Sequence, residues 1–295
     1  MRRLESDSPN LIVRKRDELD LKDQSQVESF FDEQRPKLVI MAAGLVGGIV
    51  YNRDYPADFI LENLAIQMNT MKAAQRTGVE RFLFFGSSCM YPKDCPQPMS
   101  EDMLLAGKPE ETSMPYAIAK LAGVQMCLAF NRQHKAVRFL PVIPNTIYGP
   151  NDNFDPQKSH VIPALIRRFH EAKTDESKSI ALWGSGSPRR ESIYVDDLVD
   201  ACVQLLDADT EQFEFPLNIG TGRDYEIREI ADIIKKVVGY RGRIEWDGSK
   251  PDGSPQKLLD SSKILRSGWK PKVELDEGIK KTYDWFLKKV MKEAA

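Results

Sequence analysis

A strand, a helix and a second strand follow one another within about 35 residues near the start of the chain, and this alternation constrains the fold most. The segment LIVRKRDELD, from Leu11 to Asp20, opens with three apolar residues of the kind found in a short buried strand. A helical stretch over 25–34 leads into the apolar run KLVIMAAG at 37–44. This pattern predicts a parallel βαβ unit.

The same alternation continues through the first half of the chain. Residues 56–78 have helical periodicity, with Pro56 in the first turn and Gly78 at the C-terminal stop. RFLFFGSS at 81–88 is a buried strand ending in small residues, and a helical stretch begins near Tyr116. We therefore predict an α/β fold in which residues 1–150 form a Rossmann-type, doubly wound parallel sheet.

Loops dominate the sequence after Gly149. Segments such as WGSGSPRRES, NIGTGRDY and KPDGSPQK separate short strands from short helices. Residues 151–295 are predicted to form a smaller, loop-rich C-terminal lobe that covers the ligand crevice of the first. Neither internal repeats nor low-complexity tracts are present, which argues against a solenoid.

Charge and hydropathy exclude several classes of protein. The 295 residues carry 42 Lys plus Arg and 44 Asp plus Glu, and this balance argues against nucleic acid as the main partner. The longest apolar run, Leu38 to Tyr51, is interrupted by glycines and is shorter than the ~20 residues of a membrane-spanning helix. The N-terminal MRRLESDSPN precedes no apolar segment typical of a secretory signal. No membrane association is expected.

The cysteines and histidines show no metal-binding spacing. Cys89, Cys95, Cys127 and Cys202 contain no CxxC pair, which argues against structural zinc and a disulfide framework. Unpaired cysteines suit a reducing compartment, so the cytoplasm is expected. The three cysteines after Cys89 are predicted to be structural. His134 and His170 are predicted to be exposed, because their helical surroundings are polar.

Three residue types suited to hydride-transfer chemistry occur in order. Ser87 and Ser88 end a predicted strand, where ligands bind in open α/β sheets. Tyr116 and Lys120, four residues apart, share one helix face. A free phenol has a pKa of about 10, and we expect the nearby cation to lower it toward neutrality. Tyr and Lys at this spacing recur by chance on helix surfaces, so the strand-terminal serines are what make the pattern informative.

Several longer segments resemble one enzyme family. Ser87, Tyr116 and Lys120 resemble the triad of extended short-chain dehydrogenases that act on nucleotide sugars. From about Leu11 to Phe286 the chain is similar to the GDP-L-fucose synthase family. The most specific segments are SSCMYP, DNFDPQKSHVIPALIRRFH and KPDGSPQKLLD, which general sugar epimerases and dehydratases do not share. Further matches are VGGIVYNRDYPADFILEN, MPYAIAK, NTIYGPNDNF, WGSGSPRRE, VDDL and NIGTG.

This resemblance implies conversion of GDP-4-keto-6-deoxy-D-mannose to GDP-L-fucose, by 3,5-epimerisation and then NADPH-dependent 4-reduction. It implies that Tyr116 donates a proton to the 4-oxygen, that Lys120 orients the cofactor ribose and that Ser87 contacts a sugar oxygen. Cys89 and His160 match the pair that moves protons at C3 and C5. Thiol and imidazole groups have ordinary pKa values near 8.5 and 6.5, which suit proton transfer beside a ketone. Taken alone, Cys89 would be read as a core residue and His160 as a loop residue.

The resemblance also implies ligand contacts and a homodimer formed by the helices over 57–77 and from Tyr116 onward. The implied cofactor-binding residues are Arg14, Arg16, Asp17, Leu19, Phe85, Gly86, Ser88, Lys120, Asn145, Thr146, Ile147 and His160. The implied GDP-sugar contacts are Arg168, Trp183, Arg190 and Asp252. Arginines at the second strand suit the 2′-phosphate of NADP(H), because an NAD site places an acidic residue there. The alternative for Arg168 and Arg190 is a solvated surface position.

The chain departs from the family at its start. The family opens with a strand and a GxxGxxG turn that seats a pyrophosphate, whereas MRRLESDSPN resembles the end of the helix that follows. Gly44, Gly47 and Gly48 belong to a later strand end and do not replace that turn. We expect the first strand to be missing, with unpaired edges on its neighbours. We expect either a start assigned too late or a truncated form that binds cofactor poorly, and the intact later motifs favour the former.

Two other functions stay open at this point. One is a different nucleotide-sugar epimerase or a 4,6-dehydratase, which the presence of Cys89 and His160 disfavours. The other is a truncated, catalytically silent chain or partner subunit that binds a GDP-sugar without hydride transfer. A separate hypothesis rests on the intact Cys89 and His160 beside the missing glycine turn: the chain exchanges solvent deuterium into the keto-sugar but reduces it poorly.

Overall fold

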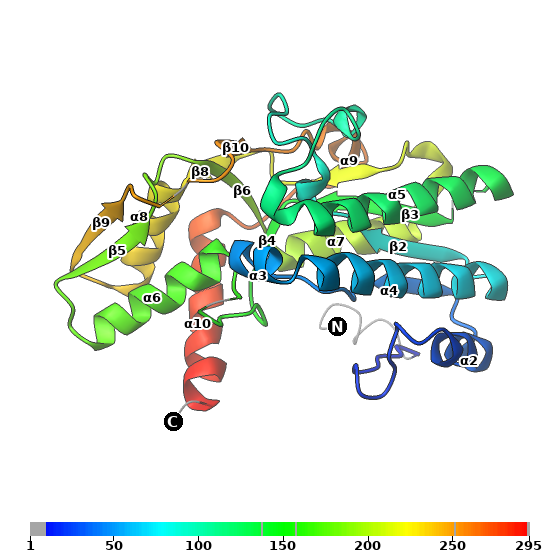
Figure 1. The fold of residues 1–295 in the computed structure, drawn as a ribbon, viewed down its shortest axis with the longest axis horizontal. Coiled ribbons are helices and arrows are strands. Elements are labelled where there is room, and N and C mark those ends of the chain that lie inside the picture. Colours follow the sequence, from blue (N-terminus) through cyan, green and yellow to red (C-terminus); the bar gives the residue numbers. More distant parts are fainter. Residues whose placement is uncertain (1–9, 137, 157, 251, 294–295) are drawn as a thin grey trace.

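The computed structural model describes residues 10–293 except 137, 157 and 251, and its first sheet contains four parallel strands in the order β1-β2-β3-β7. These strands are β1 (Leu38–Met41), β2 (Arg81–Phe85), β3 (Phe139–Pro144) and β7 (Leu217–Ile219). The sheet crosses one half of the molecule in Figure 1. The predicted parallel α/β sheet is confirmed.

Helices cover both faces of this sheet. On one face, Phe82 and Phe84 of β2 join a hydrophobic cluster under α4 (Pro56–Thr77) and α5 (Met114–His134), which lie side by side in Figure 1. On the other face, Leu83 packs with residues of α7 (Val195–Asp207). Successive strand residues point to opposite faces, so this alternation identifies a doubly wound sheet.

Local signals in the sequence set the ends of several helices. Asp23 caps α2 (Gln24–Gln34) by accepting hydrogen bonds from the backbone of Ser25 at 2.9 Å and Gln26 at 3.1 Å. Pro56 begins α4, and Gly78 ends it with a φ of 77°, a left-handed conformation that favours glycine. The predicted boundaries of α4 are therefore confirmed.

The remaining strands form two smaller sheets. β6 (Arg189–Tyr194) lies between β4 (Thr146–Tyr148) and β10 (Gln256–Lys257), with β8 (Asp224–Glu226) pairing antiparallel to it. β5 (Ser179–Trp183) pairs with β9 (Arg243–Asp247). The short helices are α3 (Ile49–Asp54) and α9 (Ser262–Leu265), and single 3₁₀ turns are η1 (Ser88–Met90), η2 (Glu101–Met103), η3 (Glu111–Ser113) and η4 (Thr210–Gln212).

A second core holds the other lobe together. Ile166, Phe169, Ile230 and Phe286 are almost fully buried within it. They come from three helices, α6 (Val161–Thr174), α8 (Ile227–Val238) and α10 (Leu275–Glu293), which Figure 1 shows at the opposite end from α4 and α5. β7 lies well beyond residue 150 in the sequence but belongs to the first sheet. The division into two lobes near residue 150 therefore stays a prediction, and the chain returns to the first lobe at least once.

β1 lies at the edge of the first sheet. Its Leu38 and Ile40 are 49% and 36% exposed, as expected for a strand without a neighbour on one side. The strand predicted at Leu11–Val13 is wrong: these residues are exposed and take no regular structure. A strand is stable only when its backbone groups are paired, and no strand of the described residues lies beside them. Among the described helices, none is both long and apolar enough to cross a membrane.

Candidate active site

The turn after β2 carries three candidate residues. Gly86 brings this turn close to β3, because a Cβ there would lie 2.8 Å from Met90 and 3.3 Å from the Val142 carbonyl. The Ser87 hydroxyl then accepts a hydrogen bond from the Cys89 backbone at 3.2 Å and caps η1. Cys89 is thereby held half-buried at the carboxyl end of the sheet, which is the edge where open α/β sheets bind their ligands.

Tyr116 and Lys120 meet this turn from α5. The Lys120 ammonium is buried and donates to the Phe85 carbonyl at 3.0 Å, and it lies 5.9 Å from the centre of the Tyr116 ring. The Ser87 hydroxyl interacts with the Tyr116 phenol and lowers its pKa. Ser87, Tyr116 and Lys120 therefore form one cluster, built by a strand end and one helix face.

The electrostatics of this cluster differ from the expectation that the cation lowers the phenol pKa. Burial, with a smaller contribution from the Cys89 charge, raises the pKa of Tyr116 above its usual range and outweighs the hydrogen bond from Ser87. Burial also lowers the pKa of Lys120 to about 8. The phenol is thus protonated at neutral pH, which suits a proton donor.

Asn145 ties the turn to the second lobe. Its Oδ1 accepts from the Ser88 hydroxyl at 3.1 Å, while its Nδ2 donates to Glu191 at 2.8 Å and to the Lys257 carbonyl at 3.2 Å. Glu191 is fully buried and also accepts from the backbone of Gly222 at 2.7 Å and Leu259 at 3.0 Å. Burial raises its pKa against these hydrogen bonds.

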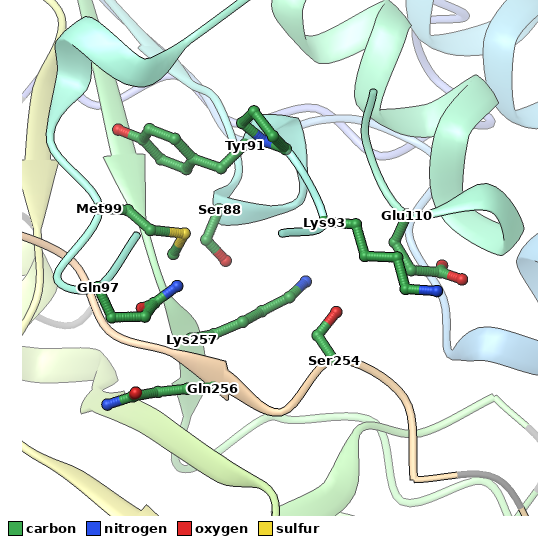
Figure 2. Close-up of a pocket in the computed structure, with 10 residues that line it drawn as sticks. Ser88, Tyr91, Lys93, Gln97, Met99, Glu110, Ser254, Gln256 and Lys257 are labelled. Carbon is green, nitrogen blue, oxygen red and sulfur yellow. The ribbon is translucent and has the colours of Figure 1, made fainter. Parts of the chain in front are cut away.

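A second cation, Lys257, faces the thiol of Cys89, with its Nζ 3.7 Å from the Sγ. Figure 2 shows its amine in a pocket lined by Ser88, Lys93, Glu110 and Ser254 among others. Sequence reasoning did not single out Lys257. Its only signal was its place in the KPDGSPQKLLD segment, because 168 residues separate it from Cys89.

His160 occupies the N-terminal cap of α6, with an exposed side chain that makes no capping hydrogen bond. The residues before it lie against Gly48, whose backbone donates to the Lys158 carbonyl at 3.2 Å. Desolvation by the surrounding protein lowers the pKa of His160 below its usual value. Within the described residues no hydrogen bond joins His160 to Cys89, whereas the Cys89 charge acts on the Tyr116 phenol.

The other two histidines differ from one another. His134 is exposed as predicted. His170 is half-buried, with its Nδ1 3.0 Å from the Tyr283 hydroxyl, so its predicted exposure is wrong. The polar neighbours in sequence gave no sign of Tyr283 and Phe286, which contact His170 from the distant α10. Cys95, Cys127 and Cys202 are buried free thiols, in line with structural positions.

The predicted cofactor residues at the start of the described chain lie on the surface. Arg16 pairs with Glu62 of α4 at 3.0 Å, and Arg14 lies 5.7 Å from the ring of Phe30. Both guanidinium groups are exposed. Asp17 and Leu19 share the same loop, whereas Phe85, Gly86, Ser88, Asn145, Thr146 and Ile147 lie at the carboxyl ends of β2 and β3 and at the start of β4.

The predicted nucleotide contacts lie in the second lobe. Trp183 is 62% exposed at the end of β5, and Lys250 lies 5.9 Å from the centre of its ring. Arg168 donates to the Ala181 carbonyl of the same strand. Asp252 accepts hydrogen bonds from the backbone and hydroxyl of Ser185, both at 2.7 Å. The Asp252 carboxylate therefore fixes the turn beside Trp183.

Arg190 interacts electrostatically with two predicted site residues, Cys89 and Asp252. Burial lowers its pKa, while the charges of Cys89 and Asp252 oppose that shift. A guanidinium stays protonated at any physiological pH. Arg190 is half-buried and is therefore not the solvated surface residue of the alternative interpretation.

Comparisons with known proteins agree with this arrangement. The NAD dependent epimerase/dehydratase family matches residues 1–220. The chain is 51% identical over 284 residues to the putative GDP-L-fucose synthase 2 of Arabidopsis thaliana, covering 96% of this chain and 86% of that protein. It is 47% identical to the GDP-L-fucose synthase of Escherichia coli, and this match covers 94% of this chain and 88% of that protein.

A solved structure shares the fold closely. A GDP-mannoheptose C4 reductase from Campylobacter jejuni with NADP bound superposes with a TM-score of 0.88 at 36% identity. The match covers 96% of this chain and 91% of that one.

Proposed function

The chain belongs to the NAD dependent epimerase/dehydratase family and, within it, to the GDP-L-fucose synthases, and from this premise we propose that it converts GDP-4-keto-6-deoxy-D-mannose to GDP-L-fucose. The reaction combines 3,5-epimerisation with NADPH-dependent 4-reduction. One observation carries the proposal: Cys89 follows Ser87 in the turn that also meets Tyr116 and Lys120. A proton-transfer residue and a reducing cluster therefore share one strand end.

The residues at this strand end fit a nicotinamide nucleotide. A Cβ on Gly44 would lie 2.7 Å from Asn63 and 3.6 Å from the Lys120 Nζ, so only glycine allows the loop after β1 to pass this close to Asn63 and the ammonium. Lys120 would hold the cofactor there, with Arg14 and Arg16 toward a 2′-phosphate. When bound, NADPH supplies the hydride that reduces C4. NADP bound to a related C4 reductase supports this choice.

The residues of the chain supply the proton for the reduction. Tyr116, protonated because of its burial, donates a proton to the 4-oxygen as that oxygen gains charge. Ser87, whose hydroxyl acts on the same phenol, holds the same oxygen. The Lys120 ammonium favours the phenolate that remains.

Epimerisation uses a second pair of residues. The hydrogens at C3 and C5 are acidic because each adjoins the 4-ketone, so a base removes one and an enolate results. Cys89 and His160 are the proposed base and acid, acting on opposite faces of the sugar. The lowered pKa of His160 keeps its imidazole largely neutral at pH 7.

The nucleotide is proposed to lie on the second lobe. Arg168 and Arg190 suit a diphosphate because guanidinium groups pair with its oxygens in a fixed geometry. Trp183 offers an exposed ring for a base, and Asp252 holds the adjoining turn. These four residues fit a GDP-sugar as the substrate class.

We further propose a homodimer in the cytoplasm. Leu61 and Met68 of α4 and Ile118 of α5 are 65%, 47% and 44% exposed. Exposed apolar side chains on two adjacent helices favour burial against a second copy. Four free cysteines suit a reducing compartment.

The test is turnover of the keto-sugar by the purified chain. With GDP-4-keto-6-deoxy-D-mannose and NADPH, we expect loss of NADPH absorbance and formation of GDP-L-fucose, with deuterium from D₂O at C3 and C5. Reduction without deuterium at these carbons would indicate a simple C4 reductase. Binding of the GDP-sugar without turnover would indicate a silent binding protein. Either outcome contradicts the proposal.

A further inference from the structure

The backbone around Lys257 is fixed from several sides. β10 pairs in parallel with β6, which places Lys257 opposite Arg190. Asn145 donates to the Lys257 carbonyl at 3.2 Å, and the next residue, Leu258, donates its backbone N–H to Gln97 at 2.8 Å. The start of the Lys257 side chain is therefore set by three separate segments of the chain.

The side chain of Lys257 ends at the thiol of Cys89. The Nζ–Sγ distance is 3.7 Å, and both residues are half-buried. Among the described residues, no carboxylate oxygen lies within 4.0 Å of the Lys257 Nζ, so Lys257 forms no ion pair there. Glu110 shares the pocket (Figure 2), but its carboxylate accepts from the Thr112 hydroxyl at 2.5 Å and the Ser113 backbone at 3.2 Å. Among the described residues, the Cys89 thiol is thus the hydrogen-bond partner of the Lys257 amine.

Resting on the proposed function, we propose that Lys257 is a positioning residue for proton transfer, whose ammonium stabilises the thiolate of Cys89. A cation beside a cysteine favours the thiolate, which is the form that accepts a proton. In the step itself, the Cys89 sulfur takes the proton from the C–H bond beside the ketone. The electron pair of that bond forms the enolate, and Lys257 remains protonated.

The other groups around the thiol leave this role to Lys257. The Tyr116 phenol is uncharged at neutral pH. Arg190 is the second cation whose charge reaches Cys89, but in the proposed complex its guanidinium faces the diphosphate. With substrate bound, the Arg190 charge is therefore offset by phosphate oxygens, whereas the Lys257 amine has the Cys89 thiol as its hydrogen-bond partner.

The first test measures the thiol without any substrate. Iodoacetamide alkylates a thiolate, which displaces iodide, so the rate at Cys89 follows its thiolate fraction. We expect Lys257→Met to slow alkylation at pH 7 by about fivefold, since one cation within 4 Å is lost from a partly solvated site. Lys257→Arg retains the charge and restores most of the rate. Peptide mass spectrometry separates Cys89 from the three buried cysteines.

The matched control is Lys93→Met, which removes a cation from the same pocket (Figure 2) and is expected to change the rate by less than about twofold. An unchanged alkylation rate in Lys257→Met would overturn the proposal. So would a rate lowered equally by Lys93→Met, or a low rate in Lys257→Arg, because neither outcome follows from a charge held at 3.7 Å. This test stands even if the keto-sugar proves not to be the substrate.

The second test separates this role from phosphate binding. In deuterium uptake from D₂O, Lys257→Met is expected to lower kcat by about fivefold, leave KM within about twofold, and move the rising limb of the pH profile to higher pH. An increase in KM with unchanged kcat and unchanged alkylation would instead make Lys257 a substrate-binding residue and contradict the proposal. No deuterium uptake in the unmodified chain, together with slowed alkylation, would refute the proposed function alone.

Discussion

The two halves of the proposed site are built in different ways. The reducing half takes Ser87, Tyr116 and Lys120 from one strand end and the helix that follows it, within 34 residues of sequence. The proton-transfer half takes Cys89 from the same turn but Lys257 from a strand 168 residues away. The first half is a local product of one βα unit. The second exists only when both lobes are in place, so the two halves should fail separately.

The largest expected effect is loss of reduction in Tyr116→Phe. Removing the hydroxyl removes the proton donor, so NADPH oxidation should fall by about 10²–10⁴-fold. Deuterium uptake at C3 and C5 should continue, because it needs no hydride. Both are measured on one sample by absorbance and NMR. Parallel loss of the two activities would mean that the halves are not separable.

The reciprocal variants, Cys89→Ser and His160→Asn, should abolish deuterium uptake. A hydroxyl is a far weaker base than a thiol at neutral pH, so the expected loss in Cys89→Ser is about 10²-fold. In Cys89→Ser, cofactor binding, measured by NADPH fluorescence, should not change. Cys202→Ala, which alters a buried thiol elsewhere, serves as the control. Full uptake in either active-site variant would remove that residue from the proton-transfer half.

The pH dependence should differ between the halves because of Lys120, whose pKa burial lowers to about 8. Above that pH the ammonium loses its proton and no longer favours the phenolate of Tyr116. Reduction should therefore fall about tenfold between pH 7 and pH 9, measured with saturating substrates. In Lys120→Arg the cation persists, and the pH profile should be flat over this range. The same fall in both proteins would assign it to another group.

The smallest effect should come from the exposed arginines. Arg14→Ala combined with Arg16→Ala should weaken NADPH binding about fivefold and leave NADH binding unchanged, because only NADPH carries a 2′-phosphate. Lys15→Ala lies between them and is the matched control. Calorimetry measures each dissociation constant. An equal loss for both cofactors would place these arginines outside the phosphate site.

Sequence patterns predict the local half of the molecule well. The helix that starts at Pro56 and ends at Gly78 follows from its own residues, and the clustering of Ser87 with Tyr116 follows from strand–helix alternation. The strand predicted at Leu11–Val13 fails because a strand depends on a partner that lies elsewhere in sequence. A pattern carries no information about such a partner.

The difference between local patterns and tertiary contacts also explains where the predicted chemistry of the site was wrong. The spacing of Tyr116 and Lys120 indicates that a cation is near the phenol, but burial decides the direction of the pKa change and raises it. His170 is polar in its helix and half-buried in the fold, since Tyr283 arrives from α10. Lys257 could not be predicted for the same reason. Tertiary contacts govern all three.

The buried carboxylate of Glu191 has a consequence for the order in which the chain matures. It joins Asn145, Gly222 and Leu259 through hydrogen bonds, so its charge is fully compensated only after the last of these has left the ribosome. Domains commonly fold from the N-terminus during synthesis. The reducing cluster can form early on the nascent chain, whereas the proton-transfer half is completed only when residues near 260 reach Asn145 and Glu191.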